Sequence, residues 1–164
     1  MNPPLLAIGS GPLALEPLIA AVCDGDPVRV GSDGAVVTFL GLVRNHNVGR
    51  QVLFLEYEAY DALAVRSFER IATEIGERWP SVRLGLHHRK GRLEIGEASV
   101  LIVTASKHRA DAYAANRYAI ERIKQIAPIW KHEHFEGGDV WIEGATADPD
   151  DAAARAAAER AACA

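Results

Sequence analysis

The sequence predicts an α+β domain whose sheet is mixed and largely antiparallel. Its 164 residues, 49% of them hydrophobic, suit one domain with a single core. Runs of β-branched and apolar residues follow one another between turn residues, and a few segments with a helical repeat interrupt them. Consecutive strands of this kind pair mainly as hairpins, which distinguishes the α+β class from regularly alternating α/β folds.

The first quarter of the chain is expected to contain a strand, a helix and a second strand. Residues 5–8 form a short apolar run, and residues 13–23 place leucine, isoleucine and valine at helical spacing. The turn-forming residues 24–27 end this helix. Residues 34–42 are apolar and rich in β-branched side chains, so they predict a buried strand.

A polar loop, a strand and a long helix are expected next. Residues 44–50 are rich in turn formers, whereas the side chains of residues 51–57 alternate between the two faces of a strand. Asp61 is positioned to cap a helix whose apolar stripe continues to Trp79. Pro80 ends this helix because proline cannot donate the next backbone hydrogen bond.

The second half predicts further strands around one more helix. The expected strands comprise residues 82–88, 92–95 and 98–104. Ser106 is expected to cap a helix that runs to Ile126, just before Pro128. Residues 129–135 and 140–143 then form a closing hairpin around a glycine-rich turn.

Residues 1–146 are therefore assigned to one domain, and the alanine-rich residues 147–164 to a C-terminal tail. Alanine favours helix, but its side chain offers little surface to bury against a core. A short helix without tertiary packing is marginal in water. The tail is expected to be frayed or disordered.

Composition and charge exclude several classes of protein. A net charge of −4 disfavours a general nucleic-acid binder, which would be basic, and no apolar run approaches the length of a membrane span. Residues 1–11 lack the features of a secretory signal. Cys23 and Cys163 have no metal-binding or redox spacing, so we expect free thiols and a cytoplasmic protein.

Basic side chains are concentrated between residues 104 and 134, where six lysines and arginines face three carboxylates. Lys124 and Lys131 flank the junction of helix, proline and strand around Pro128. A partly buried amine beside a second cation has a lowered pKa, which favours the neutral, nucleophilic form. The alternative is a solvated pair, in which Lys124 merely complements the dipole at the end of its helix.

Two further segments suggest anion binding. Lys107, His108 and Arg109 lie at the predicted start of a helix, where cations are disfavoured unless an anion binds there. Arg44 and His46 follow a predicted strand, and the planar guanidinium group of arginine can donate two parallel hydrogen bonds to a phosphate. The alternative in both cases is a set of surface side chains that point into water.

His132 and His134 share one face of a predicted strand. Two histidines at this spacing can bind a metal ion, but no third ligand with convincing spacing is evident in the sequence. We therefore expect no metal site and no cofactor.

Taken together, these segments resemble the large, catalytic subunit of molybdopterin synthase. The resemblance covers roughly residues 5–144, and its matching pieces are residues 34–39, 43–47, 105–109, 124–131 and 138–143. Each motif alone is modest, whereas their order and spacing together are specific. The resemblance implies an α/β hammerhead-like fold with an added small β-subdomain.

The resemblance also implies a reaction and a partner. Enzymes of this family are sulfurtransferases that convert cyclic pyranopterin monophosphate (precursor Z) into molybdopterin by inserting two sulfurs as a dithiolene. The sulfur arrives as a thiocarboxylate on the C-terminal Gly-Gly of a small ubiquitin-like subunit. Two large and two small subunits form a heterotetramer around a homodimer of large subunits.

By position, Lys124 matches the essential lysine of the family and Lys131 its second catalytic lysine. The resemblance assigns Arg44, His108, Arg109 and Phe39 to substrate binding. It leaves open whether Lys124 attacks the carbonyl of the partner's tail or stabilises charge during transfer. One family feature is absent, because Ala145 stands where some relatives carry an arginine that reaches across the dimer.

The alternative to an enzyme is a non-catalytic module that uses the same basic pocket. Such a module would bind a phosphorylated ligand or the C-terminal tail of a partner. Lys124 distinguishes the two functions, because its removal should abolish turnover in an enzyme but only weaken binding in a module.

Overall fold

The computed structural model describes residues 2–24, 31–142 and 144–164. Within these residues the chain forms, in order, β1 (Leu6–Gly9), α1 (Leu15–Asp24), β2 (Ala35–Leu42), β3 (His46–Asn47), β4 (Arg50–Ala59), α2 (Asp61–Arg78), β5 (Arg83–Arg89), β6 (Gly91–Glu94), β7 (Ala98–Ser106), α3 (Arg109–Ile126), β8 (Ile129–Phe135), β9 (Gly138–Ile142) and α4 (Ala152–Ala162). This arrangement confirms the predicted α+β class.

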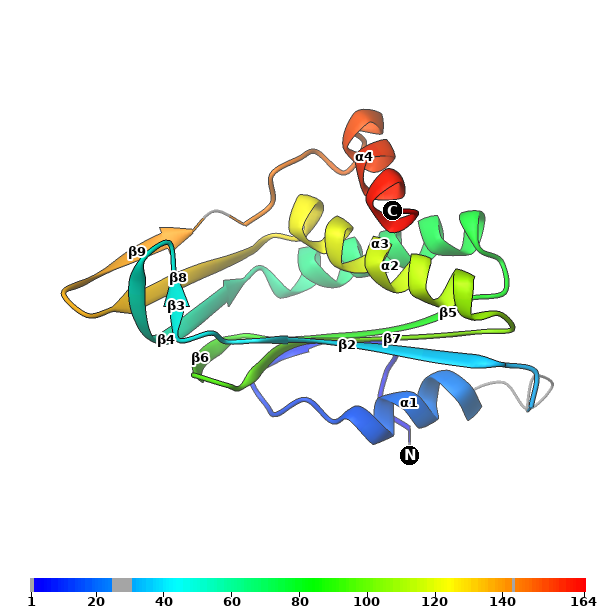
Figure 1. The fold of residues 1–164 in the computed structure, drawn as a ribbon, viewed down its shortest axis with the longest axis horizontal. Coiled ribbons are helices and arrows are strands. Elements are labelled where there is room, and N and C mark those ends of the chain that lie inside the picture. The colour runs from blue at the N-terminus through cyan, green and yellow to red at the C-terminus, as the bar shows by residue number, and fades with distance from the viewer. Residues whose placement is uncertain (1, 25–30, 143) are drawn as a thin grey trace.

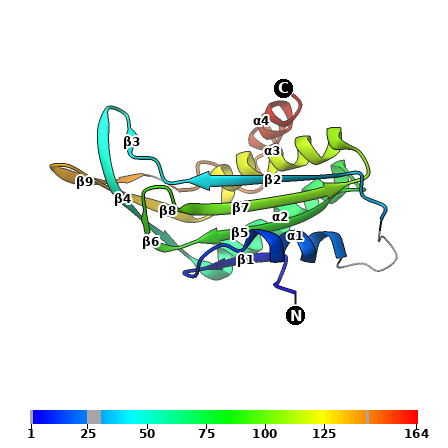
Figure 2. The ribbon, with the colours of Figure 1, turned by 60° about the horizontal axis from the view of Figure 1, so that its bottom comes forward.

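A four-stranded sheet in the order β1-β5-β7-β2 forms the centre of the molecule. Strands β1 and β5 are parallel, and the other neighbours are antiparallel, so the sheet is mixed as predicted. Helices α2 and α3 cover one face, and α1 covers part of the other (Figures 1 and 2). The sheet is therefore buried on both sides at its centre.

Strand β7 shows why the sequence folds in this way. Its side chains alternate between two apolar clusters: Val100 and Ile102 pack under α2 and α3, whereas Leu101 and Val103 pack against α1. All four side chains are at least 95% buried. A strand covered on both faces needs a continuous apolar stretch, and residues 100–103 provide one at the centre of β7.

A second sheet is built around β4, which pairs with β8 along one edge and with β6 along the other. β3 and β9 extend this antiparallel sheet, and it projects from the end of the molecule opposite the start of α3 (Figure 1). Several short connections join the two sheets: β5 leads almost directly into β6 through Lys90, residues 95–97 join β6 to β7, and residues 43–45 join β2 to β3. Their junction forms a hollow, described below.

The expected cap of α3 is wrong. Ser106 is the last residue of β7, fully buried, and its hydroxyl hydrogen-bonds that of Ser81 at 2.9 Å. The helix begins at Arg109 after His108, whose side chain makes no capping bond within the described residues. β7 continues because its last residues pair with β2 and β5, and this pairing outweighs the local preference of serine for a cap.

The C-terminal tail also differs from the expectation, because residues 152–162 form the helix α4, packed on α3. Asp151 caps it by accepting hydrogen bonds from the backbone amides of Ala153 and Ala154. Ala158 is 99% buried, and Gln125 donates a hydrogen bond to the carbonyl of Ala154. Tertiary packing supplies the stability that an isolated alanine-rich helix lacks.

A buried ion pair joins α2 to α3 beneath this helix. Arg122 is fully buried and donates two hydrogen bonds to Glu74, at 2.9 and 2.8 Å, while the hydroxyl of Tyr118 donates a third at 2.7 Å. Burial raises the pKa of Glu74, but the bonds from Arg122 and Tyr118 outweigh it and lower the pKa below its usual range. Arg122 also donates to the carbonyl of Pro149, which leads into α4.

No helix among the described residues is long and apolar enough to cross a membrane.

We expect the substitution Glu74→Gln to lower the free energy of unfolding by about 3–5 kcal/mol, because it leaves the buried guanidinium of Arg122 without its countercharge. Urea unfolding followed by circular dichroism measures this change. Glu77→Gln is the matched control on the same helix, since Glu77 is exposed and pairs with Arg155. That control should change stability by less than about 1 kcal/mol. Equal effects would show that the Glu74 pair is not buried in solution.

Candidate active site

A pocket of about 380 Å³ lies where the last turn of α3 meets β2, β4 and β8. Its apolar wall includes Phe39, Ile120, Ile123 and Ile129. Two amines, those of Lys124 and Lys131, are the cationic groups that line it. The structure therefore brings together three of the predicted site residues, Phe39, Lys124 and Lys131, from three separate elements.

The proline junction places both lysines. α3 ends at Ile126, Ala127 is its C-terminal cap, and β8 begins at Ile129 after Pro128. Lys124 is exposed in the last helical turn, whereas Lys131 is partly buried on the strand, directly opposite Tyr57 of β4. The exposed Lys124 therefore lies at the mouth of the pocket, and the partly buried Lys131 lies in its wall.

Lys131 is the partly buried amine of the pocket. Burial lowers its pKa below the usual range, and the neighbouring charges of Arg44 and Lys124 add to this effect, while Glu133 opposes it. A lower pKa increases the fraction of neutral amine near pH 7, which is the form that acts as a nucleophile or base. The partial burial predicted around the Pro128 junction is thus found at Lys131, whereas Lys124 is exposed.

Arg44 lies in a smaller adjoining hollow of about 150 Å³, together with His46 and Asn47. Tyr57 and Lys131 line this hollow and the main pocket alike, so the two spaces share a wall. The exposed Arg44 is close enough to influence the charge of Lys131. It is therefore adjacent to the pocket, as predicted for an anion-binding residue.

Glu133 holds the Arg44 loop against β8. Its carboxylate is 99% buried and accepts hydrogen bonds from Asn47 at 2.8 Å and from Arg50 at 3.2 Å. Asn47 and Arg50 are paired residues at the ends of β3 and β4, so the carboxylate ties their hairpin to β8. Sequence reasoning did not single out Glu133, because its importance depends on the pairing of strands distant in the sequence.

The structure also places Tyr57, His88 and Ser99 in the pocket wall, none of which the sequence analysis selected. Burial raises the pKa of the Tyr57 hydroxyl, and a hydrogen bond with Ser99 opposes this. His88 is 93% buried and packs edge-on against Tyr57, with ring centroids 5.2 Å apart. Burial lowers the pKa of His88 to about 4, partly offset by its bond to the carbonyl of Arg89, so this wall is uncharged at neutral pH.

Gly144 completes the wall and must be glycine. A Cβ atom at this position would collide with the backbone carbonyl of Ile129, because the chain crosses the start of β8 there at very close range.

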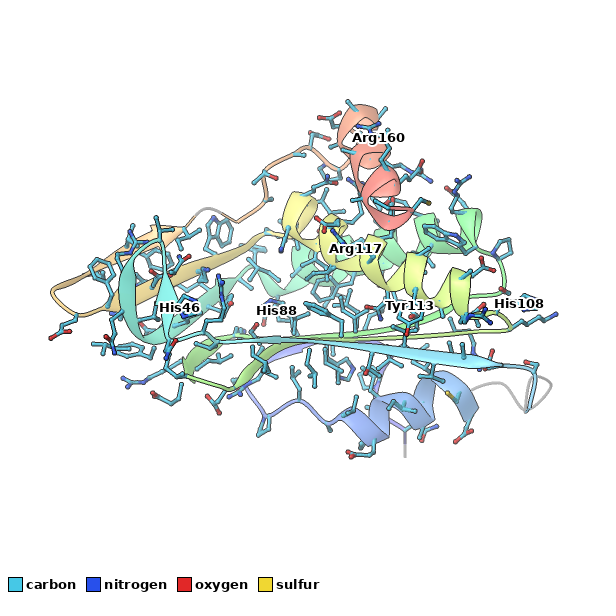
Figure 3. All side chains as sticks on the ribbon, in the orientation of Figure 1. His46, His88, His108, Tyr113, Arg117 and Arg160 are labelled. Atoms are coloured by element: carbon cyan, nitrogen blue, oxygen red, sulfur yellow. The ribbon has the colours of Figure 1, made fainter. Side chains whose placement is uncertain are left out.

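His108 and Arg109 do not join this cluster within one chain. They lie at the N-terminal end of α3, whereas Lys124 lies near its C-terminal end, about 22 Å away at 1.5 Å per residue. Figure 3 shows His108 at the end of the molecule opposite His46 and the second sheet. Because α3 begins at Arg109, Lys107 and His108 precede the first helical turn, and Arg109 alone of these three residues lies within it.

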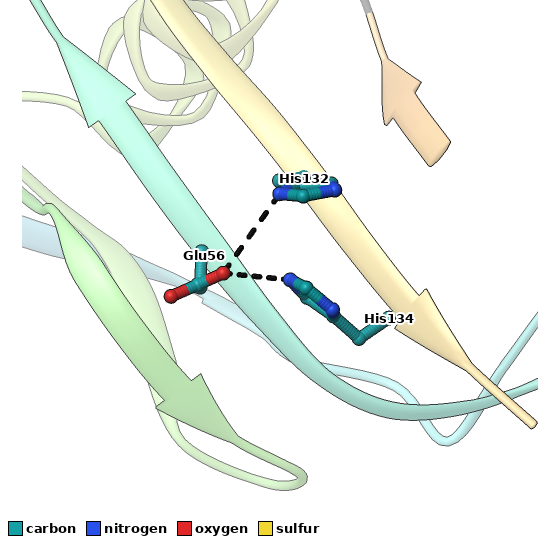
Figure 4. Close-up of side chains that lie close together, drawn as sticks. All are labelled: Glu56, His132 and His134. Atoms are coloured by element: carbon teal, nitrogen blue, oxygen red, sulfur yellow. Dashed lines mark hydrogen bonds and ion pairs between the residues drawn. The ribbon is translucent and has the colours of Figure 1, made fainter. Parts of the chain in front are cut away.

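His132 and His134 point to the other face of the second sheet, away from Lys131 and Glu133, because side chains alternate along β8. The sequence shows no third group near them, but the strand pairing brings one into place. Glu56 of β4 lies beside both rings (Figure 4), and its nearest carboxylate oxygen is 2.6 Å from Nε2 of His134.

The buried His88 makes stability depend on pH. Between about pH 6.5 and 4 the unfolded chain takes up a proton at this histidine that the folded chain excludes, so stability is lost as the pH falls through this window. We expect the wild type to lose about 3 kcal/mol more than His88→Phe over that range. Urea unfolding at a series of pH values measures the difference, and parallel curves for the two proteins would contradict the assignment.

Known proteins match both the sequence and the fold. The model of the MoaE protein family matches residues 11–126. The molybdopterin synthase catalytic subunit of Halalkalibacterium halodurans is 46% identical over 136 residues, which cover 83% of each chain, and that of a Nostoc species is 45% identical over 138 residues, 83% of this chain and 80% of the relative.

Solved structures agree with these relatives. The crystal structure of molybdopterin synthase from Staphylococcus aureus superposes with a TM-score of 0.79 at 40% identity and covers 86% of this chain and 98% of its own. A complex of subunits 1 and 2 of the molybdopterin-converting factor from Helicobacter pylori superposes with a TM-score of 0.67 at 28% identity, covering 84% of this chain and 90% of the matched one. Sequence, fold and pocket thus agree, and the chain belongs to the MoaE protein family.

Proposed function

We propose that this chain is the catalytic subunit of a molybdopterin synthase and works in the cytoplasm. It transfers sulfur from the thiocarboxylated C-terminus of a small ubiquitin-like subunit to precursor Z, and so builds the dithiolene of molybdopterin. The observation that carries the proposal is the convergence of Lys124 and Lys131 on one pocket in a chain of the MoaE family. This chain requires no cofactor for the transfer.

The pocket offers the groups that such a transfer needs. The lowered pKa of Lys131 increases the neutral fraction of this amine, and the exposed Lys124 stands at the mouth, where the tail of the small subunit enters. An amine in this position either attacks the thiocarboxylate carbonyl or stabilises the negative charge that develops during transfer. Arg44, beside Lys131, is placed to bind the phosphate of precursor Z.

The partner is a small subunit that ends in Gly-Gly. A chain end without side chains is narrow enough to enter a pocket walled by Phe39 and the isoleucines of α3. The two-subunit complex from Helicobacter pylori supports this assembly, because its matched chain shares the fold of this one.

His108 and Arg109 act, in this proposal, at the pocket of a second copy of the chain. Their distance from Lys124 along α3 excludes them from the pocket of their own chain. The outer face of β2 supports a homodimer. Val36, Leu40 and Leu42 are 42%, 41% and 56% exposed there, and within the described residues β2 pairs with β7 alone. Two such dimerised chains and two small subunits make a heterotetramer.

Loss of either amine should abolish the chemistry without abolishing assembly. We expect Lys124→Ala and Lys131→Ala each to lower the rate of molybdopterin formation roughly 100-fold or more. The assay supplies precursor Z and thiocarboxylated small subunit and measures molybdopterin. Binding of the small subunit is measured separately by calorimetry and should change little.

Lys90→Ala is the matched control, since Lys90 pairs with Asp61 away from the pocket, and it should retain the wild-type rate. If the pocket variants lose only affinity, or if the wild type makes no molybdopterin, the chain is instead a binding module for a phosphorylated ligand or for the tail of a partner.

A site shared between two chains predicts complementation. Lys124→Ala and His108→Ala should each be inactive alone, yet a mixture refolded together should recover about a quarter of the wild-type activity, because each mixed dimer keeps one intact site. Co-refolding of Lys124→Ala with Lys131→Ala is the control and should recover nothing, since both lysines belong to one pocket. Absence of recovery in the first mixture would place His108 outside the site.

A further inference from the structure

We propose that Glu56, His132 and His134 form a binding site for a divalent transition-metal ion, best suited to Zn²⁺, on the face of the second sheet opposite the lysine pocket. Each residue offers one ligand atom, and these atoms all lie within 4.8 Å of one another. This metal site is separate from the lysine pocket, and metal binding there does not depend on the proposed sulfur transfer.

Strand register brings the three groups together. Glu56 of β4 is directly opposite His132 of β8, and the next pair on the same face is Phe54 with His134. Because side chains on one face of a sheet recur every second residue, the two imidazoles lie next to each other with the carboxylate across from them. The ring centroids of the two histidines are 4.2 Å apart.

The distances are close to those that a metal ion requires. Oε2 of Glu56 lies 2.6 Å from Nε2 of His134 and 3.8 Å from Nδ1 of His132. Ligand atoms at about 2.0–2.2 Å from a tetrahedral zinc ion are separated by roughly 3.3–3.5 Å, so Glu56 must move by less than about 1 Å relative to each imidazole. Its side chain is 43% exposed and free to make that adjustment.

His132 is already oriented as a ligand by a second carboxylate. Its Nε2 lies 2.7 Å from Oδ2 of Asp139, on the neighbouring strand β9. In this pairing the carboxylate accepts the proton on Nε2. Nδ1 then carries the lone pair and faces Glu56. Carboxylates hold metal-binding imidazoles in this way at known zinc sites.

Aromatic rings fix both imidazoles from the sides. Trp141 stacks on His132 and Phe54 stacks on His134, each with centroids 4.2 Å apart and nearly parallel planes. Arg92 in turn lies over the ring of Phe54 at 3.7 Å. Each imidazole is thus held between an aromatic ring and the other imidazole, so it loses little conformational freedom when an ion binds, as a preformed site requires.

The ligand set selects the kind of ion. Two imidazoles and one carboxylate suit Zn²⁺ and its neighbours Co²⁺ and Ni²⁺, whereas Mg²⁺ and Ca²⁺ prefer oxygen ligands alone. Three protein ligands leave one tetrahedral position for water. The ion replaces the hydrogen that now joins His134 to Glu56. A bound ion would cross-link β4 and β8 on the sheet face opposite Lys131.

The test uses the untagged full-length chain and titrates it with Zn²⁺ by calorimetry and with Co²⁺ by visible absorption. We expect one ion per chain, the intense bands of tetrahedral Co²⁺, and a rise in the melting temperature with Zn²⁺. His134→Gln and Glu56→Gln should each weaken binding at least tenfold, and Asp139→Asn about 10–100-fold through the orientation of His132.

His87→Gln is the matched control, because His87 lies on β5 away from the cluster and contacts the carbonyl of Pro4. It should bind Zn²⁺ with wild-type affinity. Circular dichroism of each variant shows that the fold is retained. Unchanged binding in both His134→Gln and Glu56→Gln, or the absence of saturable binding in the wild type, would overturn the proposal.

Discussion

The antiparallel pairing of β4 with β8 is the constraint on which both faces of the second sheet depend. It sets Tyr57 opposite Lys131 on the pocket side, and Glu56 opposite His132 on the other side. A shift of one residue would exchange the two faces, carrying Lys131 out of the pocket and Glu133 away from Asn47 and Arg50. The buried carboxylate of Glu133 therefore stabilises the register that places the amine of Lys131 in the pocket.

The rigid helix α3 imposes a second constraint. Its last turn carries Lys124 into the pocket, and its first turn holds Arg109 about 22 Å away. Because the helix is rigid, basic residues at its two ends lie far apart in space although they belong to the same basic segment of the sequence. The proposed homodimer brings these residues together in a site shared between identical chains, and the exposed apolar face of β2 is the surface proposed for that pairing.

Ionic contacts in the core anchor the elements behind the pocket. The pair of Arg122 with Glu74 joins α3 to α2, and Arg122 also reaches the carbonyl of Pro149 ahead of α4. Ile123 and Lys124 follow immediately on the same helix and line the pocket. The position of the last turn of α3 is thus fixed by polar contacts on one side and by apolar packing on the other.

The sequence by itself determined the α+β class, the approximate positions of the long helices and of the strands other than β3, and the choice of the two lysines around Pro128 as candidates for the site. These follow from local periodicity, from helix-stopping residues and from a motif contained in one short segment. Tertiary structure alone decided the extension of β7 through Ser106, the folding of α4, the buried state of His88, and the meeting of Glu56 with His132 and His134. Each of these depends on strand register or on packing between residues distant in the chain, and local sequence preferences contain no information on either.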